Sequence, residues 1–312
     1  MTDPAPAVVV QGLTRRFGDL VAVDAICFSV ARGELFGIVG PDGAGKTTTL
    51  RMLAGVLRPT AGDAIVNGVS VMRDPERVKH SIAYMSQRFG LYADLTVLEN
   101  LNFYADLYEV PKGERPARLE RLFRFSNLGP FRDRLAGELS GGMKQKLGLS
   151  CALVHQPEVL LLDEATFGVD PISRRDLWLI VHDMVARGVT VVVSTAYMDE
   201  AERFDRVLLI HEGRALALDT PAALQRGLDG DLLAVRLPRV RDARNAALRI
   251  PTVRAVAVFS DCLHVKVDSA ETDGPVVEAA LREAGFPVLE MNMVQPSMED
   301  VFIDRIAATE GT

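Results

Sequence analysis

The feature that most constrains this chain is the segment GPDGAGKT at residues 40–47, which satisfies the pattern G-x-x-x-x-G-K-[ST]. An apolar run at 35–40 leads into it, and leucines at helical spacing follow it. Glycines allow backbone N–H groups to turn toward phosphate oxygens, and the start of the next helix favours anions. The segment therefore predicts a strand, a phosphate loop and a helix, against the alternative of a glycine-rich turn with an incidental lysine.

Each part of this loop has an expected role. Lys46 would place a positive charge on the β and γ phosphates, Thr47 would offer a hydroxyl to magnesium, and Thr48 would extend the start of the helix. The predicted nucleotide-binding residues here are Gly40, Pro41, Asp42, Gly43, Ala44, Gly45, Lys46, Thr47 and Thr48.

Two adjacent carboxylates end a second apolar run, VLLLDE at residues 159–164. We expect Asp163 to hold magnesium, directly or through water. Glu164 lies one residue beyond the strand and can face a terminal phosphate, so it is the candidate general base or water-positioning group. An exposed acidic turn is the alternative, and the upstream phosphate loop favours the catalytic interpretation.

Composition excludes several classes of protein. The 312 residues are 48% hydrophobic and carry a formal net charge of −7, so a globular fold is expected and general nucleic-acid binding is not. No uncharged apolar stretch reaches the length of a membrane-spanning helix. The start MTDPAPAVVV lacks the basic residues of a signal peptide, which favours a cytoplasmic location. The cysteines are expected to be reduced structural thiols: Cys27, Cys151 and Cys262.

Apolar β-branched runs alternate with helical patterns up to about residue 219, which predicts an α/β fold with a mostly parallel sheet. One helix is especially clear, with Asp170 as its cap, Pro171 in its first turn and Gly188 as its end. Residues 91–155 lack a clear strand pattern and are interpreted as an inserted helical subdomain.

The chain is expected to divide into a first domain at residues 1–230 and a small α+β domain at 231–312. In the second domain strands are predicted near 232–237, 262–267 and 287–294, with helices at 242–249 and 275–284. This alternation suggests a split βαβ sandwich. The domain contains no catalytic cluster in its sequence, and His264 is predicted to be an isolated residue on a strand surface.

The segment LSGGMKQK at 139–146 begins another helical pattern, so Ser140, Gly141 and Gly142 would form a second anion-binding turn. With this order of motifs the chain resembles the ATP-binding cassette (ABC) ATPases, whose signature is LSGGQ. In that family two subunits enclose ATP between the phosphate loop of one and the signature of the other. The resemblance implies a P-loop NTPase domain with a mixed sheet and a helical subdomain, and ATP and Mg²⁺ as cofactors.

Further residues are assigned by this resemblance. Phe17 is similar to the aromatic residue on which adenine stacks, although a lone Phe is more often a core residue. Gln87, in YMSQ, is similar to the Q-loop glutamine that reaches magnesium. Asp170, in GVDP, is similar to the D-loop aspartate that contacts the opposite subunit. The implied catalytic set is Glu164, Gln87 and Lys46, and the implied metal ligands are Thr47, Gln87 and Asp163.

The sequence departs from the family at two positions. Ala196, in STAYMDEAE, replaces the histidine that contacts the γ-phosphate, and a methyl group cannot hydrogen-bond phosphate or fix water. Ala165 stands where the family has proline. We therefore expect the isolated chain to hydrolyse ATP slowly. Our hypothesis is that it pairs with a different ATPase subunit that carries the histidine. A homodimer is the rival.

The segments RFGLY at 88–92 and QPSMEDVF at 295–302 resemble the bacterial multidrug exporter group, whose ATPases carry a C-terminal accessory domain. Drug or lipid efflux, membrane permease partners and a position on the inner face of the cell membrane are implied. Phe89, Leu91 and Tyr92 form a candidate permease-docking patch. The alternative function is a soluble ABC mechanochemical or ATP-sensing module.

Overall fold

The computed structural model describes residues 5–87, 90–259 and 261–310. The chain divides into two compact units, residues 1–218 and 219–312. The division falls about twelve residues before the boundary expected from the sequence, because the short helix α7 (Pro221–Arg226) belongs with the second unit. Among the described residues, none of the helices is both long enough and apolar enough to cross a bilayer.

A six-stranded sheet forms the centre of the first unit. Its strand order is β10 (Arg214–Asp219), β9 (Arg206–His211), β3 (Leu35–Val39), β8 (Thr190–Thr195), β7 (Val159–Asp163) and β6 (Ile82–Met85). The pairs from β9 to β6 are all parallel. Strands β3, β7 and β8 are buried along their whole length, which explains their continuous apolar runs.

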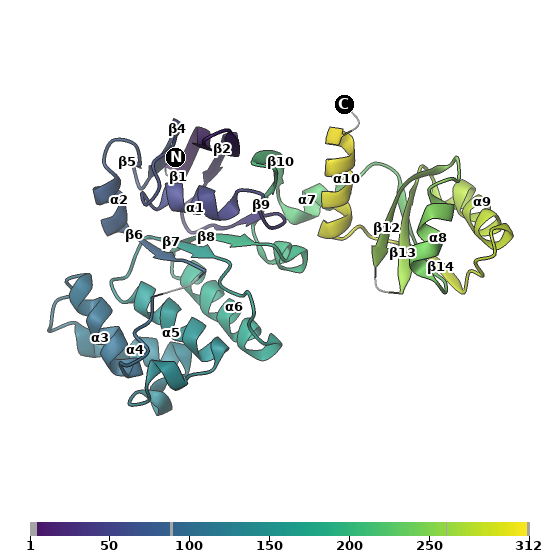
Figure 1. Ribbon diagram of the computed structural model, residues 1–312. Coiled ribbons are helices and arrows are strands. Elements are labelled where there is room, and N and C mark those ends of the chain that lie inside the picture. Colours follow the sequence, from purple (N-terminus) through teal and green to yellow (C-terminus); the bar gives the residue numbers. More distant parts are fainter. Residues whose placement is uncertain (1–4, 88–89, 260, 311–312) are drawn as a thin grey trace. The chain divides into compact units, whose positions relative to one another are not determined.

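A second sheet in this unit was not foreseen from the sequence. It is antiparallel where its pairing is given, with the order β2 (Leu20–Val30), β1 (Val8–Phe17), β4 (Ala61–Val66) and β5 (Val69–Ser70). Helix α1 (Lys46–Leu53) contacts strands of both sheets and lies between them (Figure 1). Its buried Leu50 belongs to a core that includes Phe36 of the central sheet and Ile26 of the outer one. The alternating burial of β1 and β2 was less diagnostic than the apolar runs of the parallel strands.

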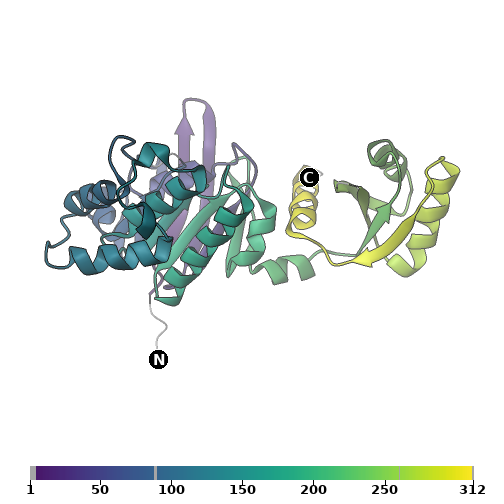
Figure 2. The same cartoon turned by 90° about the horizontal axis from the view of Figure 1, so that it is seen from below.

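The other face of the central sheet is covered by α5 (Gly141–Leu153) and α6 (Pro171–Ala186), and Figure 2 shows the helices of this side in front of the strands. Between β6 and β7 the described residues form a helical segment. Its other elements are α3 (Val97–Leu107), α4 (Arg115–Ser126) and the 3₁₀ turns η1 (Gly129–Phe131) and η2 (Ala136–Glu138). The first unit also contains α2 (Pro75–Ser81) and η3 (Met198–Arg203).

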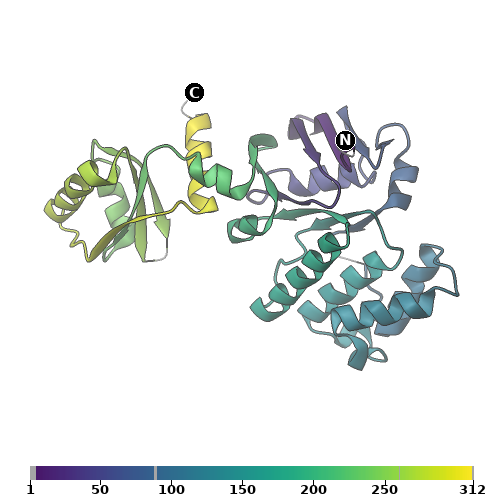
Figure 3. The ribbon, with the colours of Figure 1, turned by 180° about the vertical axis from the view of Figure 1, so that it is seen from behind.

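The second unit is the split βαβ arrangement expected from its alternation of elements. Its sheet has the order β12 (Val253–Phe259), β13 (Cys262–Val267), β11 (Asp231–Arg236) and β14 (Glu290–Val294), with antiparallel pairing throughout. Helices α8 (Val240–Ala247) and α9 (Ala270–Glu283) cover one face, and α10 (Met298–Glu310) lies on the other with α7 (Pro221–Arg226) (Figure 3). Strand β12 and helix α10 were missed by the sequence analysis.

The prediction that His264 is isolated is wrong. Its Nδ1 lies 2.9 Å from Oδ1 of Asp300, at the start of α10, and its ring stacks on Phe259. The N–H and hydroxyl of Ser297 donate to Oδ2 of Asp300 at 2.9 and 2.6 Å. Burial opposes ionisation of this carboxyl group, but the hydrogen bonds from His264 and Ser297 hold its pKa below the ordinary value. The QPSMEDVF segment therefore attaches α10 to the sheet.

We predict that Asp300→Asn lowers the free energy of unfolding of the second unit by about 1–3 kcal/mol, because charge-assisted hydrogen bonds to a buried group are lost. A group whose folded-state pKa is depressed stabilises the fold above its unfolded pKa, about 3.9 for Asp, and loses that effect as the pH falls through the folded value. The variant should therefore lose less stability than the parent on acidification. Urea unfolding at several pH values measures both quantities. The neighbouring exposed Glu299→Gln is the matched control, and an equal loss in both variants would contradict the assignment.

Candidate functional site

The predicted phosphate loop and the paired carboxylates meet at the carboxyl ends of three adjacent parallel strands. The N–H of Gly40, after β3, donates to the carbonyl of Thr195, at the end of β8, at 3.3 Å. The N–H of Glu164, after β7, donates to the carbonyl of Ser194 at 3.1 Å. Because β8 lies between β3 and β7, it brings the phosphate loop and the paired carboxylates together.

The phosphate loop requires glycine for close packing. A Cβ on Gly40 would lie 2.1 Å from the carbonyl oxygen of Ile210, and one on Gly45 would lie 2.4 Å from that of Ala22. Gly45 also has a φ of 103° and begins α1 without a side-chain cap. The backbone N–H groups at this helix start thus belong to a loop of the kind that binds phosphate.

Lys46 and Glu164 form a buried ion pair in this site. Nζ of Lys46 lies 3.2 Å from Oε1 of Glu164, and it donates to the carbonyl of Pro41 at 2.9 Å. Nε2 of Gln87 donates to Oε2 of Glu164 at 2.9 Å. The structure therefore brings together all three residues of the predicted catalytic set.

Glu164 has an unusual backbone conformation. Its φ is 50°, and the N–H of Phe167 donates to its carbonyl at 3.0 Å, which makes a tight turn directly after β7. A left-handed conformation is costly for a residue with a long side chain and is often found at functional sites. Ala165, which replaces the family proline, is buried in this turn.

Asp163 is almost completely buried and accepts three hydroxyl groups. Thr47 and Ser194 donate to its Oδ1 at 2.9 and 2.7 Å, and Tyr84 donates to its Oδ2 at 3.1 Å. Burial, and then the Asp163 carboxylate, raise the pKa of Tyr84 to about 12, so the phenol remains a proton donor.

Tyr84 and Ser194 were missed as functional residues. Both lie on strands that flank β7, where Leu161 pairs with Tyr84 and Asp163 pairs with Ser194. They lie in the segments YMSQ and STAY, from which the sequence analysis interpreted only Gln87 and Ala196. The signal that could have found them is their position next to strand ends, but the register that aims them at Asp163 is a property of the sheet.

These groups fit magnesium and a nucleoside triphosphate. Hard cations prefer carboxylate and hydroxyl oxygens, which Asp163 and Thr47 supply side by side. Lys46 and the uncapped start of α1 supply positive charge and N–H donors for phosphate. Gln87 donates to Glu164 in this structure, and its role as a metal ligand stays a prediction.

Phe17 lies in the hairpin that borders the phosphate loop. Its ring is 45% exposed and is covered on one face by the Arg15 guanidinium, 4.5 Å from the ring centroid. The hairpin continues to Ala22, whose carbonyl is the close neighbour of Gly45. An exposed aromatic ring beside this loop is suited to stacking on a base.

The predicted signature turn packs against the predicted D-loop. Ser140 is exposed and caps α5 by accepting from the N–H of Met143 at 3.3 Å, and Asp170 caps α6 by accepting from Ser173 at 3.0 Å. A Cβ on Gly142 would lie 2.3 Å from that of Ser173. Among the described residues, no hydrogen bond or ion pair joins Ser140, Gly141 or Gly142 to the phosphate loop of the same chain.

Ala196 follows β8 directly, beside the groups that hold Gly40 and Glu164. The turn after it is anchored by the buried Glu200, which accepts from Thr195 at 2.6 Å and from the side chains of Arg174 and Trp178 on α6 at 2.7 and 3.1 Å. The end of β8 is therefore held firmly in place, although Ala196, the residue that follows it, has only a methyl group as its side chain.

The candidate docking patch lies partly outside the described residues, because Phe89 is not among them. Leu91 lines a cavity of about 280 Å³ with Gln87, Ala93, Gly137 and Lys144 among its other walls. Tyr92 is 46% exposed and packs edge-on against Phe103 at 4.5 Å. A hollow with aromatic residues nearby therefore adjoins the glutamine that contacts Glu164.

Two family models match parts of this chain. Residues 23–167 match the family model described as ABC transporter, and residues 220–306 match the C-terminal domain of DrrA1-3-like ATP-binding proteins. Among solved structures, an ATP-binding subunit of an ABC transporter matches with a TM-score of 0.65 and 30% identity, covering 70% of this chain and 92% of that one.

Two curated relatives cover most of this chain. The probable multidrug ABC transporter ATP-binding protein YbhF of Escherichia coli is 43% identical over 301 residues, which are 95% of this chain and 51% of YbhF. The daunorubicin resistance ATP-binding protein DrrA3 of Streptomyces coeruleorubidus is 35% identical over 301 residues, 95% of each chain. This chain thus spans about half the length of YbhF and nearly the whole length of DrrA3.

We predict that Gly142→Ala destabilises the first unit, because its Cβ would overlap the Ser173 side chain. Ser173→Gly should restore stability to the level of that single variant, since it removes the overlapping atoms. The control is Gly141→Ala, where a Cβ meets nothing within 4 Å. Unfolding temperatures of the parent, the two single variants, the double variant and the Gly141→Ala control measure this coupling, and equal effects of the two alanine variants would refute the close contact.

Proposed function

The chain belongs to the ATP-binding cassette family, and from this premise we propose that it is the ATP-binding and ATP-hydrolysing subunit of an exporter. The observation that carries the proposal is the convergence of Lys46, Asp163 and Glu164 at one sheet edge. Motifs far apart in the sequence meet there with the chemistry that phosphoryl transfer to water requires.

MgATP would supply the phosphoanhydride bond that is broken. Lys46 and the N–H groups of residues 40–48 would hold the phosphates, and Thr47 and Asp163 would hold magnesium. The Glu164 carboxylate is suited to orient a water molecule and accept its proton, and Gln87 holds that carboxylate from Oε2. Tyr84 and Ser194 keep Asp163 oriented by donating to its two oxygens.

The site is proposed to be completed by a second ABC subunit. Ser140 and Gly141 are exposed, and the signature turn has no bonds to the phosphate loop of its own chain among the described residues. The exposed turn is therefore available to the nucleotide of a partner. Asp170 beside it would contact that partner as well. Whether the partner is identical or carries a histidine at the position of Ala196 decides between a homodimer and a heterodimer.

Membrane permeases are the proposed partners for transport. The cavity beside Gln87, with Leu91 and Ala93 in its walls, offers a hollow that a permease helix can enter. Binding there would act on Glu164 through the 2.9 Å bond from Gln87. The relatives named for multidrug transport and daunorubicin resistance favour efflux of drug-like compounds. The chain would work at the inner face of the cell membrane.

We predict that Ala196→His raises the ATPase rate of the purified chain by about tenfold or more, because an additional donor would face the γ-phosphate. The double variant Ala196→His with Glu164→Gln should lose this gain while retaining MgATP binding. Phosphate release and equilibrium nucleotide binding measure the two effects. An isolated parent chain that already turns over rapidly, or one that fails to bind MgATP, would contradict the proposal.

We predict that Ala93→Arg reduces copurification with membrane permease from detergent-solubilised membranes, since the long, charged arginine side chain would fill the hollow beside Gln87. ATP binding by the purified variant should be unchanged. Ala117→Arg, an exposed alanine on α4, is the matched control. If both variants retain the permease equally, this hollow is not the docking surface.

A further inference from the structure

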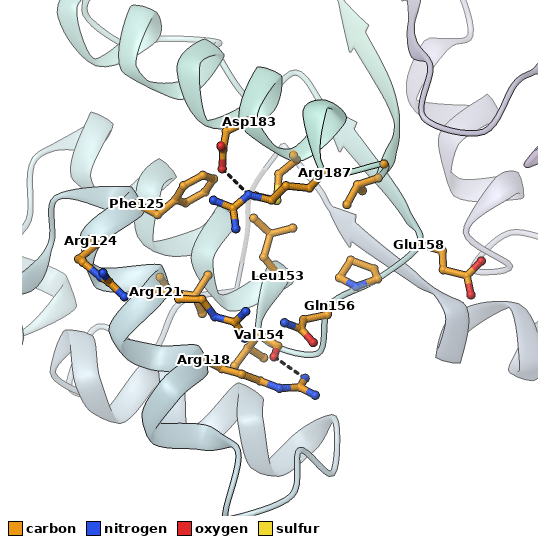
Figure 4. A pocket seen from close by; sticks show the side chains of 15 residues that line it. Arg118, Arg121, Arg124, Phe125, Leu153, Val154, Gln156, Glu158, Asp183 and Arg187 are labelled. Atoms are coloured by element: carbon orange, nitrogen blue, oxygen red, sulfur yellow. Dashed lines mark hydrogen bonds and ion pairs between the residues drawn. The ribbon is translucent and has the colours of Figure 1, made fainter.

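The first unit contains a large pocket on the side of the sheet away from the predicted nucleotide site. Its volume is about 780 Å³, within the range of pockets for drug-sized ligands. It is lined by α4, by the end of α5 and of α6, and by the turns that lead into β7 and β8 (Figure 4). Because β7 and β8 are parallel, their beginnings lie at the opposite edge from Asp163 and Ala196.

Positive charge dominates the lining. The lining includes four arginines, Arg118, Arg121, Arg124 and Arg187, and two carboxylates, those of Glu158 and Asp183. This excess stands on a chain whose formal net charge is −7. The pocket is therefore a local site of positive charge on an acidic protein.

Both carboxylates in the lining already have partners. Glu158 forms an ion pair with Arg32 at 3.1 Å, and Asp183 pairs with Arg187 at 2.8 Å. Neither carboxylate pairs with an arginine of α4. Among the described residues, no carboxylate lies within ion-pair distance of Arg121 or Arg124. In Figure 4 the side chains of Arg121 and Arg187 extend toward Leu153, whereas Glu158 extends away from them. The guanidinium groups of Arg121 and Arg124 thus remain available to an external anion.

Most of the other side chains in the lining are apolar. Leu122, Leu153 and Val154 are buried beneath it, and Phe125 and Met184 are half-buried in its walls. A bare inorganic anion would leave this surface without contacts, and a neutral apolar molecule would leave the guanidinium groups unpaired. An oxyanion joined to an apolar body satisfies both, since guanidinium groups form paired hydrogen bonds with phosphate, sulfonate and carboxylate.

We propose that this pocket binds a small amphipathic anion, a drug-sized molecule with one oxyanion group and an apolar body. Its oxyanion lies against Arg121 and Arg124, and its apolar part lies on Leu153 and Phe125. The ligand enters as a dissolved molecule, because the pocket is a hollow between secondary-structure elements rather than a flat basic surface. The site is separate from the phosphate loop and stands independently of the proposed ATPase function.

Dodecyl phosphate below its micelle concentration is the probe, and isothermal titration calorimetry on the full chain is the measurement. Saturating MgADP in every sample keeps the phosphate loop from serving as the anion site. We expect dodecyl phosphate to bind, and inorganic phosphate and the neutral dodecyl maltoside to bind at least about tenfold more weakly, because each lacks one half of the recognition.

The double variant Arg121→Glu with Arg124→Glu should weaken dodecyl phosphate binding by about tenfold or more. The matched control is Arg73→Glu with Arg77→Glu, which changes the net charge equally on an exposed part of the first unit. Met184→Trp tests the pocket by volume and should also weaken binding. Circular dichroism and unfolding temperature verify that each variant is folded.

Equal losses in the two double variants would overturn the proposal, because they would reflect net charge alone. Equal affinity for dodecyl maltoside would also overturn it, since the arginines would then play no part. Binding to anionic vesicles without binding to monomeric dodecyl phosphate would identify a membrane-contact surface instead. Loss of binding confined to the Arg121 and Arg124 variant and Met184→Trp supports the assignment.

Discussion

The buried carboxylate of Asp163 is the constraint around which the first unit is organised. An ionised group with this little exposure is costly to bury unless hydrogen bonds surround it. The donors come from three different parts of the chain, namely Thr47 at the start of α1, Tyr84 on β6 and Ser194 on β8. Satisfying one side chain therefore requires the central sheet to have its observed strand order and parallel register.

The same arrangement places the predicted catalytic groups. With β8 between β3 and β7, the phosphate loop and Glu164 lie within hydrogen-bond reach of one strand end. The Lys46–Glu164 ion pair and the bond from Gln87 follow from that position. Helix packing supplies a second constraint, because Gly142 allows the start of α5 to approach the cap of α6. The predicted anion-binding turn and the predicted D-loop aspartate are thereby presented together on the surface.

Strong local sequence patterns allowed much of the fold to be predicted. The helix at 171–186 was predicted because a cap, a proline and apolar periodicity agree, and the structure confirms it with a bond from Ser173 to Asp170. The split βαβ unit was confirmed as well. Weaker signals failed, since buried and partly exposed residues are mixed along the strands of the antiparallel sheet and along β12, unlike the fully buried parallel strands. His264 was misjudged because its partner, Asp300, lies 36 residues away on a helix that was missed.

Residue order alone specified the kind of chemistry, because a phosphate loop, a paired carboxylate and a signature turn are local patterns whose meaning depends on backbone conformation and charge. It also specified what is missing at Ala196. Partnerships between distant residues were decided by the folded chain. The attachment of Tyr84 and Ser194 to Asp163, of Gln87 to Glu164 and of Asp300 to His264 depends on strand register and helix packing, which bring side chains together across separations that no local pattern encodes.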